Sequence, residues 1–247
     1  MKESDLYPHI KSFLTDQGYE VKSEIADCDI MAVKAEDIVI IEMKTNLNLA
    51  LLGQAVERQL LFDIVYIAVP KPAYKKRFSN QYKRTIRLVK RLSLGLLYVD
   101  VRGKGACIEE FPPKNFKLGI NKTRREKLID KAVKEFEGLS GDYNIGGITR
   151  TKKMTAYKES AIAAAMYLDK FGPSSAKEMK KYGCGEKTWD IMHMNYYGWF
   201  KKVEKGTYSI TEMGRQALKE HKKIYDVLDK TLFSEENLYN SPNNQDS

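Results

Sequence analysis

Cysteine and histidine are scarce in this sequence of 247 residues, which has three of each. They are scattered along the chain, at Cys28, Cys107, Cys184, His9, His193 and His221. None of their spacings is that of a zinc site, and scattered cysteines do not provide the paired framework of a disulfide-rich secreted domain. We therefore expect a protein of the reducing cytoplasm.

Long apolar runs are missing as well, since the longest falls far short of the roughly 20 residues that span a membrane. Polar residues dominate positions 1–5 with no apolar segment behind them, so we expect neither a signal peptide nor a membrane partner. With 43% hydrophobic and 30% charged residues, the composition is that of a globular chain. Its length leaves room for one large domain or two modest ones.

Acidic residues are absent between Lys71 and Val99, in a chain whose formal net charge is +9. The cations of this stretch include Lys75, Lys76, Arg77, Lys83, Arg84, Arg87, Lys90 and Arg91. Such a run is commonly a solvated helix face, and many basic proteins have no polyanionic partner. On a chain of this charge the run also suits phosphate contacts, which favours a nucleic acid partner, in particular double-stranded DNA.

Hydrophobic periodicity and turn residues predict an α/β domain over residues 1–118. Its predicted elements are a helix over 5–17, strands over 19–25, 28–34 and 37–44, a helix over 47–60, a strand over 63–69, a basic helix over 74–92, and strands over 96–101 and 106–111. Short connections make the first three strands an antiparallel meander, and helical crossovers add parallel neighbours. The expected order αβββαβαβ gives a mixed sheet with helices on both faces.

The third predicted strand is apolar until it ends in Glu42 and Lys44. Glu-x-Lys also occurs at Glu20–Lys22 and Glu178–Lys180, so the spacing alone decides nothing, and a surface ion pair is its usual fate. Only the copy at Glu42 closes a strand that reads as buried on both faces. Charges at such a position cost free energy unless they pair or bind something.

Two further carboxylates are expected near Glu42. Asp29 lies on the neighbouring antiparallel strand, and Glu3 lies at the start of the first helix, although Asp29 could be a turn residue and Glu3 a helix cap. Clustered carboxylates share a proton or bind a divalent cation, and oxygen ligands favour Mg²⁺ or Mn²⁺. Lys44, on the same strand face as Glu42, is placed to orient a water and to offset phosphorane charge.

Polar residues continue the inward face of the helix that follows. Gln54 and Arg58 are four residues apart, and they could hold a phosphate or form an ordinary polar edge. We assign substrate binding to these two residues and to the cations Lys75, Lys76, Arg84, Arg150, Lys152 and Lys187.

The chain changes character after residue 118. Residues 119–155 read as a helical and glycine-rich linker. Three helices and a hairpin over 156–232 give the order of a winged-helix-like domain. Lys187 lies on the helix that would be its recognition helix, although such domains also bind proteins. Residues 233–247, rich in Asn, Ser and Pro, are expected to be a disordered tail.

The first 118 residues resemble the PD-(D/E)XK phosphodiesterase superfamily, which has the restriction-endonuclease-like fold. The motifs that carry this resemblance are ESDLYP from Glu3, GYEV from Gly18, CD at Cys28, EMK from Glu42, NLAL from Asn48 and QAVERQ from Gln54. The likeness to one bacterial family of this superfamily continues through GGITRTK from Gly146 to the end of the C-terminal unit. Asp29 follows Cys28 where the superfamily motif has Pro, a departure that is frequent there.

The resemblance implies roles for four residues. Asp29 and Glu42 would bind the metal, Lys44 would assist the nucleophile and Glu3 would complete the site. Our leading hypothesis is a Mg²⁺-dependent phosphodiesterase acting on DNA, with a C-terminal domain that binds or positions the duplex. The alternatives are a non-catalytic DNA-binding regulator and a hydrolase of RNA or small phosphodiesters. The sequence leaves the oligomeric state open, and a homodimer is one of the possibilities.

Overall fold

The structure is a computed structural model that describes residues 1–101, 105–114, 122–144 and 153–233. The chain divides into two compact units between Lys153 and Met154. Each unit has its own sheet and helices and is described by itself. Within the described residues, no helix combines the length and the apolar character needed to cross a bilayer.

The first unit is built on a six-stranded sheet in the order β1-β2-β3-β4-β5-β6. The strands are β1 (Glu20–Ile25), β2 (Cys28–Lys34), β3 (Asp37–Met43), β4 (Ile64–Pro70), β5 (Gly95–Val99) and β6 (Cys107–Phe111). β4 runs parallel to both β3 and β5, and the other neighbours are antiparallel. This topology confirms the predicted mixed α/β sheet, including the meander of its first three strands.

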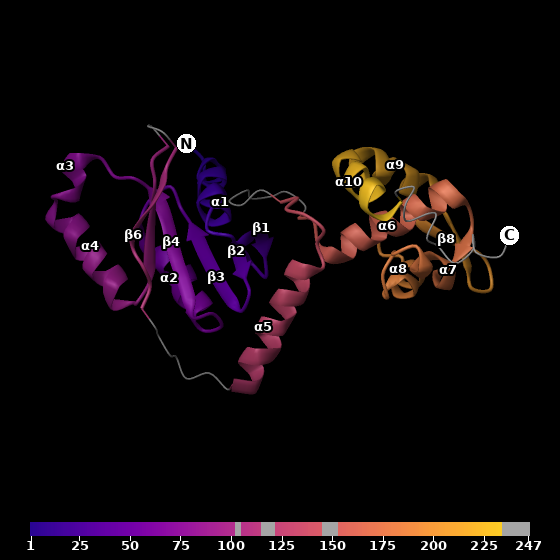
Figure 1. Cartoon of the computed structure of the whole chain (residues 1–247), viewed down its shortest axis with the longest axis horizontal. Helices are drawn as coiled ribbons and strands as arrows, with labels where there is room; N and C mark the ends of the chain where they lie inside the picture. Colours follow the sequence, from indigo (N-terminus) through magenta and orange to yellow (C-terminus); the bar gives the residue numbers. More distant parts are fainter. Residues whose placement is uncertain (102–104, 115–121, 145–152, 234–247) are drawn as a thin grey trace. The chain divides into compact units, whose positions relative to one another are not determined.

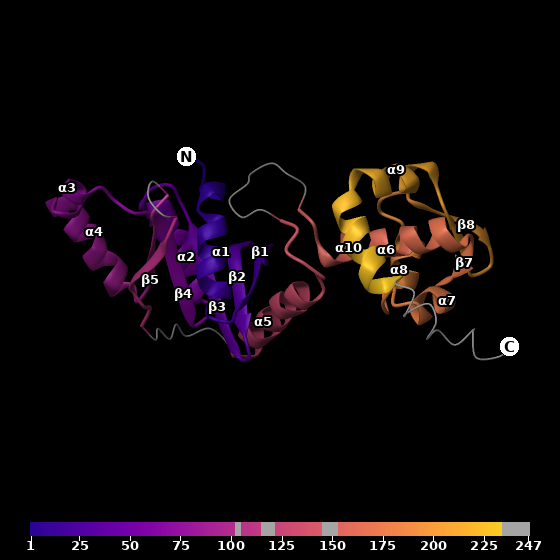
Figure 2. The ribbon, with the colours of Figure 1, turned by 45° about the horizontal axis from the view of Figure 1, so that its top comes forward.

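Helices cover both faces of this sheet. They are the short 3-10 helix η1 (Glu3–Asp5), α1 (Tyr7–Thr15), α2 (Leu49–Gln59), α3 (Tyr74–Arg77), α4 (Asn80–Arg91) and α5 (Lys122–Glu137). Figures 1 and 2 show α3 and α4 at the edge of the sheet formed by β5 and β6, and α5 at the opposite edge near β1.

Alternation along β3 decides which side chains meet which helix. Val39, Ile41 and Met43 belong to the apolar core beneath α1. Ile40 and Glu42 point to the opposite face, and both are buried there. The strand is therefore buried on both faces, as its continuous β-branched sequence predicts.

The basic helix predicted over residues 74–92 is two helices, α3 and α4. The break falls at Phe78 and Ser79, because the Ser79 hydroxyl accepts a hydrogen bond from the Tyr82 N–H at 3.2 Å and caps α4. Ser at this position competes with helix continuation by offering its oxygen to the free backbone donors of a new first turn.

The segment predicted as a linker begins with α5, which packs on the first unit. Phe136 and Ala132 of this helix are buried. The Lys22 ammonium donates to the carbonyls of Phe136 at 2.7 Å and Leu139 at 2.8 Å, and it lies 4.3 Å from the centre of the Phe136 ring. A cation here complements the C-terminal end of the helix dipole. Lys22, from the first Glu-x-Lys copy, therefore has a structural role.

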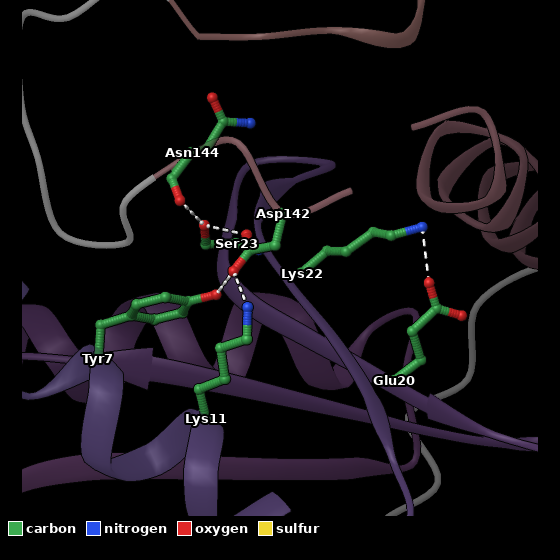
Figure 3. A network of polar contacts seen from close by, with 7 residues as sticks. All are labelled: Tyr7, Lys11, Glu20, Lys22, Ser23, Asp142 and Asn144. Atoms are coloured by element: carbon green, nitrogen blue, oxygen red, sulfur yellow. Dashed lines mark hydrogen bonds and ion pairs between the residues drawn. The ribbon is translucent and has the colours of Figure 1, made fainter. Parts of the chain in front are cut away.

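Asp142 fixes the chain that follows α5 to α1 and β1 (Figure 3). Its carboxylate accepts hydrogen bonds from the Tyr7 hydroxyl, from Lys11 Nζ at 2.6 Å and from the Ser23 N–H at 3.0 Å. The Ser23 hydroxyl lies within donating distance of Asp142 Oδ1, at 2.9 Å, and of the Asn144 carbonyl, at 2.7 Å. This buried carboxylate therefore ties three separate segments together.

The second unit is built around the apolar helix α6 (Ala156–Phe171), against which several of its other elements pack. Its other elements are β7 (Ser174–Ser175), α7 (Ala176–Lys181), α8 (Thr188–Met194), β8 (Phe200–Glu204), β9 (Thr207–Ile210), α9 (Glu212–Glu220) and α10 (Lys222–Leu232). The three strands pair antiparallel in the order β7-β9-β8. The winged-helix interpretation of this unit stays a prediction, and residues 234–247 of the expected tail lie outside the described residues.

We predict that Asp142→Ala destabilises the first unit by about 2–4 kcal/mol, because it leaves several partly buried donors without their acceptor. Native-state amide hydrogen exchange of β1 measures this loss. The matched control is Asp130→Ala, since Asp130 is exposed on α5 and its removal should change stability by less than about 0.5 kcal/mol. Equal protection of β1 in both variants would contradict the assignment.

Candidate active site

Asp29 and Glu42 meet at one end of the sheet. β2 and β3 pair with Ile30 opposite Ile41, so the same register places Asp29 opposite Glu42, on the face covered by α2. Asp29 Oδ2 accepts a hydrogen bond from the Met43 N–H at 2.8 Å. The Glu42 side chain is 1% exposed. Two acidic side chains are therefore held together in a site with little solvent.

Burial and the charges of neighbouring carboxylates raise the pKa of both carboxyl groups. Burial raises the pKa of Glu42 to about 7, the Asp29 charge adds to the rise, and hydrogen bonding to Arg58 opposes it. Burial also raises the pKa of Asp29, against the hydrogen bond from Met43, and the charge of Glu24 adds to the rise. A pair of carboxylates in this state favours a bound cation, because a cation removes the repulsion.

Arg58 is the direct partner of Glu42. Its Nε donates to Glu42 Oε1 at 2.6 Å, and its Nη2 donates to the Asp27 carbonyl at 2.6 Å. The spacing along α2 explains the contact, since Arg58 lies one turn after Gln54 on the face that meets the sheet. Arg58 was predicted to hold a substrate phosphate. In the structure its guanidinium neutralises Glu42 and anchors the turn between β1 and β2.

Lys44 and Glu3 form the second ion pair of the site. Lys44 Nζ lies 3.2 Å from Glu3 Oε2, and both side chains are about a quarter exposed, at 26% and 22%. The Lys44 N–H donates to the Ala68 carbonyl at 3.1 Å, which continues the β3–β4 pairing beyond Met43. Glu3, predicted as a third metal ligand, is thus engaged by the Lys44 ammonium.

No group of three His, Cys, Asp or Glu side chains within the described residues is arranged to hold a metal ion. The predicted triad of Asp29, Glu42 and Glu3 is therefore not assembled as a ligand set, because Glu3 forms an ion pair with Lys44. Two carboxylates still suit Mg²⁺, which proteins commonly bind through one or two carboxylates, with waters and substrate phosphates completing the octahedron. Asp29 and Glu42 are the residues that would hold it.

Gln54 supplies an unused polar atom on the same helix. Its Oε1 is buried and has no hydrogen-bond partner within the described part of the chain. Such an atom costs free energy unless water or a ligand satisfies it. This observation agrees with the predicted role of Gln54 in substrate binding, and that role stays a prediction.

Glu24 is an acidic neighbour that the sequence analysis missed. The β1–β2 register pairs Ser23 with Ile30 and Ile25 with Cys28, so Glu24 falls opposite Asp29. Its backbone has φ of 59°, and its carboxylate forms an ion pair with Lys153 at 2.7 Å. The two-residue turn at 26–27 fixes this register, so the position of Glu24 opposite Asp29 could have been predicted from the sequence.

The remaining predicted binding residues are distributed over several elements. Lys75 and Lys76 on α3 and Arg84 on α4 are exposed, whereas Arg77 forms an ion pair with Glu110 at 2.7 Å. Lys187 is the N-cap residue of α8 in the second unit. Arg150 and Lys152 lie outside the described residues.

Comparison with known proteins identifies a family for part of the chain. Residues 97–217 match the family model described as "Putative PD-(D/E)XK phosphodiesterase (DUF2161)". The match confirms the resemblance, and it begins after Asp29, Glu42 and Lys44 in the sequence. No curated protein matches the chain.

A solved structure, "SPO1766 protein of unknown function from Silicibacter pomeroyi", is also similar to the chain, with 18% sequence identity and a TM-score of 0.36. The similarity covers 54% of this chain and 84% of that one.

A double-mutant cycle with Glu42→Gln and Arg58→Met should give a coupling energy of about 1–3 kcal/mol, because the pair shares a site with little solvent. Urea unfolding with a probe in the first unit measures it. The matched control cycle is Glu126→Gln with Lys122→Met, an exposed pair on α5 with a separation of 3.9 Å, for which we expect less than about 0.5 kcal/mol. Equal coupling in both cycles would argue against a structural role for Arg58.

Proposed function

We propose that this chain, whose residues 97–217 match the PD-(D/E)XK phosphodiesterase family, hydrolyses DNA phosphodiester bonds with Mg²⁺ or Mn²⁺. The carrying observation is the pair of carboxylates formed by the buried Glu42 and the half-buried Asp29, next to Lys44 at the end of the strand that carries Glu42. The family description supports a phosphodiesterase, and the net charge of +9 supports a polyanionic substrate.

In this proposal two residues bind the metal ion and two others orient them. Asp29 and Glu42 are the groups that would bind the divalent cation, which supplies Lewis acidity at the phosphoryl group and a lower pKa for attacking water. Arg58 holds one oxygen of Glu42, so it orients this carboxylate and limits its motion. Met43 does the same for Asp29 through its backbone N–H. Both ligands are therefore fixed before substrate arrives.

Lys44 is the cation of this site that approaches the reacting phosphate. Glu3 holds its ammonium at 3.2 Å and fixes its position. In that position Lys44 orients the attacking water and offsets the negative charge that develops on the phosphate oxygens. Gln54, with its unsatisfied oxygen, is placed to accept a hydrogen bond from a water or a substrate group.

DNA binding involves surfaces on both units in this proposal. Lys75, Lys76 and Arg84 are exposed on the first unit, in the stretch without acidic residues, and would contact backbone phosphates. The second unit has the order of helices and strands expected of a winged helix, and Lys187 at the start of α8 would contact the duplex.

We expect Lys44→Ala and Glu42→Gln to lower the cleavage rate at least about 100-fold in the presence of Mg²⁺ or Mn²⁺, because each removes charge stabilisation or metal binding. A panel of linear, nicked, single-stranded and branched DNAs at saturating concentration measures the loss. Chelation of the divalent ion should abolish cleavage, and its return should restore it.

The matched control for Lys44→Ala is Lys180→Ala, in the Glu-x-Lys copy of α7. Lys180 forms an ion pair with Glu186 at 2.7 Å, and Glu178 of this copy caps its own helix. Full activity is expected of this variant. Cleavage that survives Lys44→Ala would remove the site assignment. A wild-type protein that binds DNA and cuts no substrate of the panel would instead establish a non-catalytic DNA-binding regulator.

Removing a phosphate-contacting lysine should weaken binding to all DNA sequences alike. We expect Lys75→Ala and Lys187→Ala each to reduce the slope of log affinity against log salt by about 1, because one counterion fewer is released. Fluorescence anisotropy with a labelled duplex at several salt concentrations measures the slope. Unchanged slopes would exclude these residues from the interface.

A further inference from the structure

A cavity of about 650 Å³ lies beyond the ends of the three parallel strands of the first unit. Val69 and Pro70 of β4, Tyr98 of β5 and Thr45, just after Lys44, contribute to its wall. Crevices at the carboxyl ends of parallel strands are common ligand sites in open α/β sheets. The volume is that of a typical small-molecule pocket, for which roughly 300–1,000 Å³ is usual.

Part of the cavity wall lies on the same sheet face as the candidate active site. Met43 pairs with Ala68, and the Lys44 N–H bonds to the Ala68 carbonyl, so Lys44 lies beside Val69. Val69 in turn pairs with Tyr98. Because opposed residues share a face, Lys44, Val69 and Tyr98 form one row across the sheet. Two strand spacings, about 10 Å, separate the ends of this row.

Aromatic and apolar groups form one part of the cavity wall. The Tyr82 and Tyr98 hydroxyls are hydrogen-bonded to each other, which fixes the Tyr82 ring of α4 against β5. Leu47 and Pro72 line the cavity with them. A wall of this kind suits the flat face of a nucleobase, since every base stacks on an aromatic ring.

Polar and basic groups form the other part. Gln81 and Thr85 of α4 offer an amide and a hydroxyl, which suit the hydrogen-bonding edge of a base. Lys71 and Lys76 also line the cavity and suit a phosphate. Lys71 is 3.5 Å from Asp100, so the wall carries an acceptor for sugar hydroxyls as well.

We propose that this cavity binds the nucleoside adjoining the phosphate that is cleaved. The proposal rests on the proposed phosphodiesterase function, and it defines the substrate class further. A base inside a stacked duplex cannot enter a cavity of this size with its partner, so the nucleotide must be unpaired. The preferred substrates are single strands, frayed ends and flaps.

The test compares the binding of two small ligands to the full chain, in the absence of divalent cations. Deoxyadenosine 5′-monophosphate carries a base, and deoxyribose 5-phosphate lacks one. We expect the nucleotide to bind at least tenfold more tightly in isothermal titration calorimetry. Equal affinities would overturn the proposal, because the phosphate alone would then account for binding.

Two variants place the binding site in the cavity. Ala73→Trp adds an indole at an exposed position of the wall, and Tyr82→Ala removes one aromatic ring. Both should reduce the affinity for the nucleotide to that for deoxyribose 5-phosphate, while thermal unfolding shows that they fold. The matched control is Tyr74→Ala, since Tyr74 is 77% exposed and does not line the cavity. Parent-like nucleotide binding by both cavity variants would also overturn the proposal.

Cleavage assays separate this proposal from the proposed function. If the cavity has the stated role, the parent protein cuts single-stranded DNA at least tenfold faster than blunt duplex, and Ala73→Trp removes this preference. Cleavage of both substrates at equal rates, unchanged in Ala73→Trp, would overturn the cavity and keep the phosphodiesterase. A parent protein that cuts nothing would end both proposals, even if the nucleotide binds.

Discussion

The burial of the Glu42 carboxylate is the constraint on which the candidate site depends. An ionised carboxylate at the end of a strand covered on both faces is unfavourable without partners. Arg58 supplies one partner at 2.6 Å, and the chain keeps Asp29 beside it in spite of the repulsion between the two acids. Such an arrangement makes sense if a cation is to bind there, because that cation offsets the charge that the protein leaves uncompensated.

The three Glu-x-Lys copies show that environment, and not spacing, decides what a motif does. Lys22 caps the C-terminal end of α5, and Glu178 caps the N-terminal end of α7. Only the copy at Glu42 has a second acid, Asp29, opposite its glutamate on the neighbouring strand. What distinguishes the three copies is how deeply the strand or helix end that carries each motif is buried. A sequence indicates this burial only through the residues around the motif.

Much of the sheet followed from the sequence, because period-two patterns and two-residue turns fix strands and their register locally. β2 has the predicted bounds, and the pairing that brings Asp29 to Glu42 needs only those turns. The partners of Lys44 and Arg58 could not be predicted in the same way. They depend on how far η1 and α2 approach the end of the sheet, which side-chain packing sets. Ser79, a helix cap inside a basic run, was a local signal that the charge pattern obscured.

The Asp142 carboxylate also affects how the first unit behaves among its own copies. β1 is an edge strand, and an open edge invites pairing with another chain. The Ser23 N–H, which a foreign strand would otherwise bind, donates to Asp142 instead. A chain cut at residue 118 would lose this cover together with α5, and its exposed edge would favour aggregation. The cover of this edge of the six-stranded sheet is thus encoded more than twenty residues beyond its last strand.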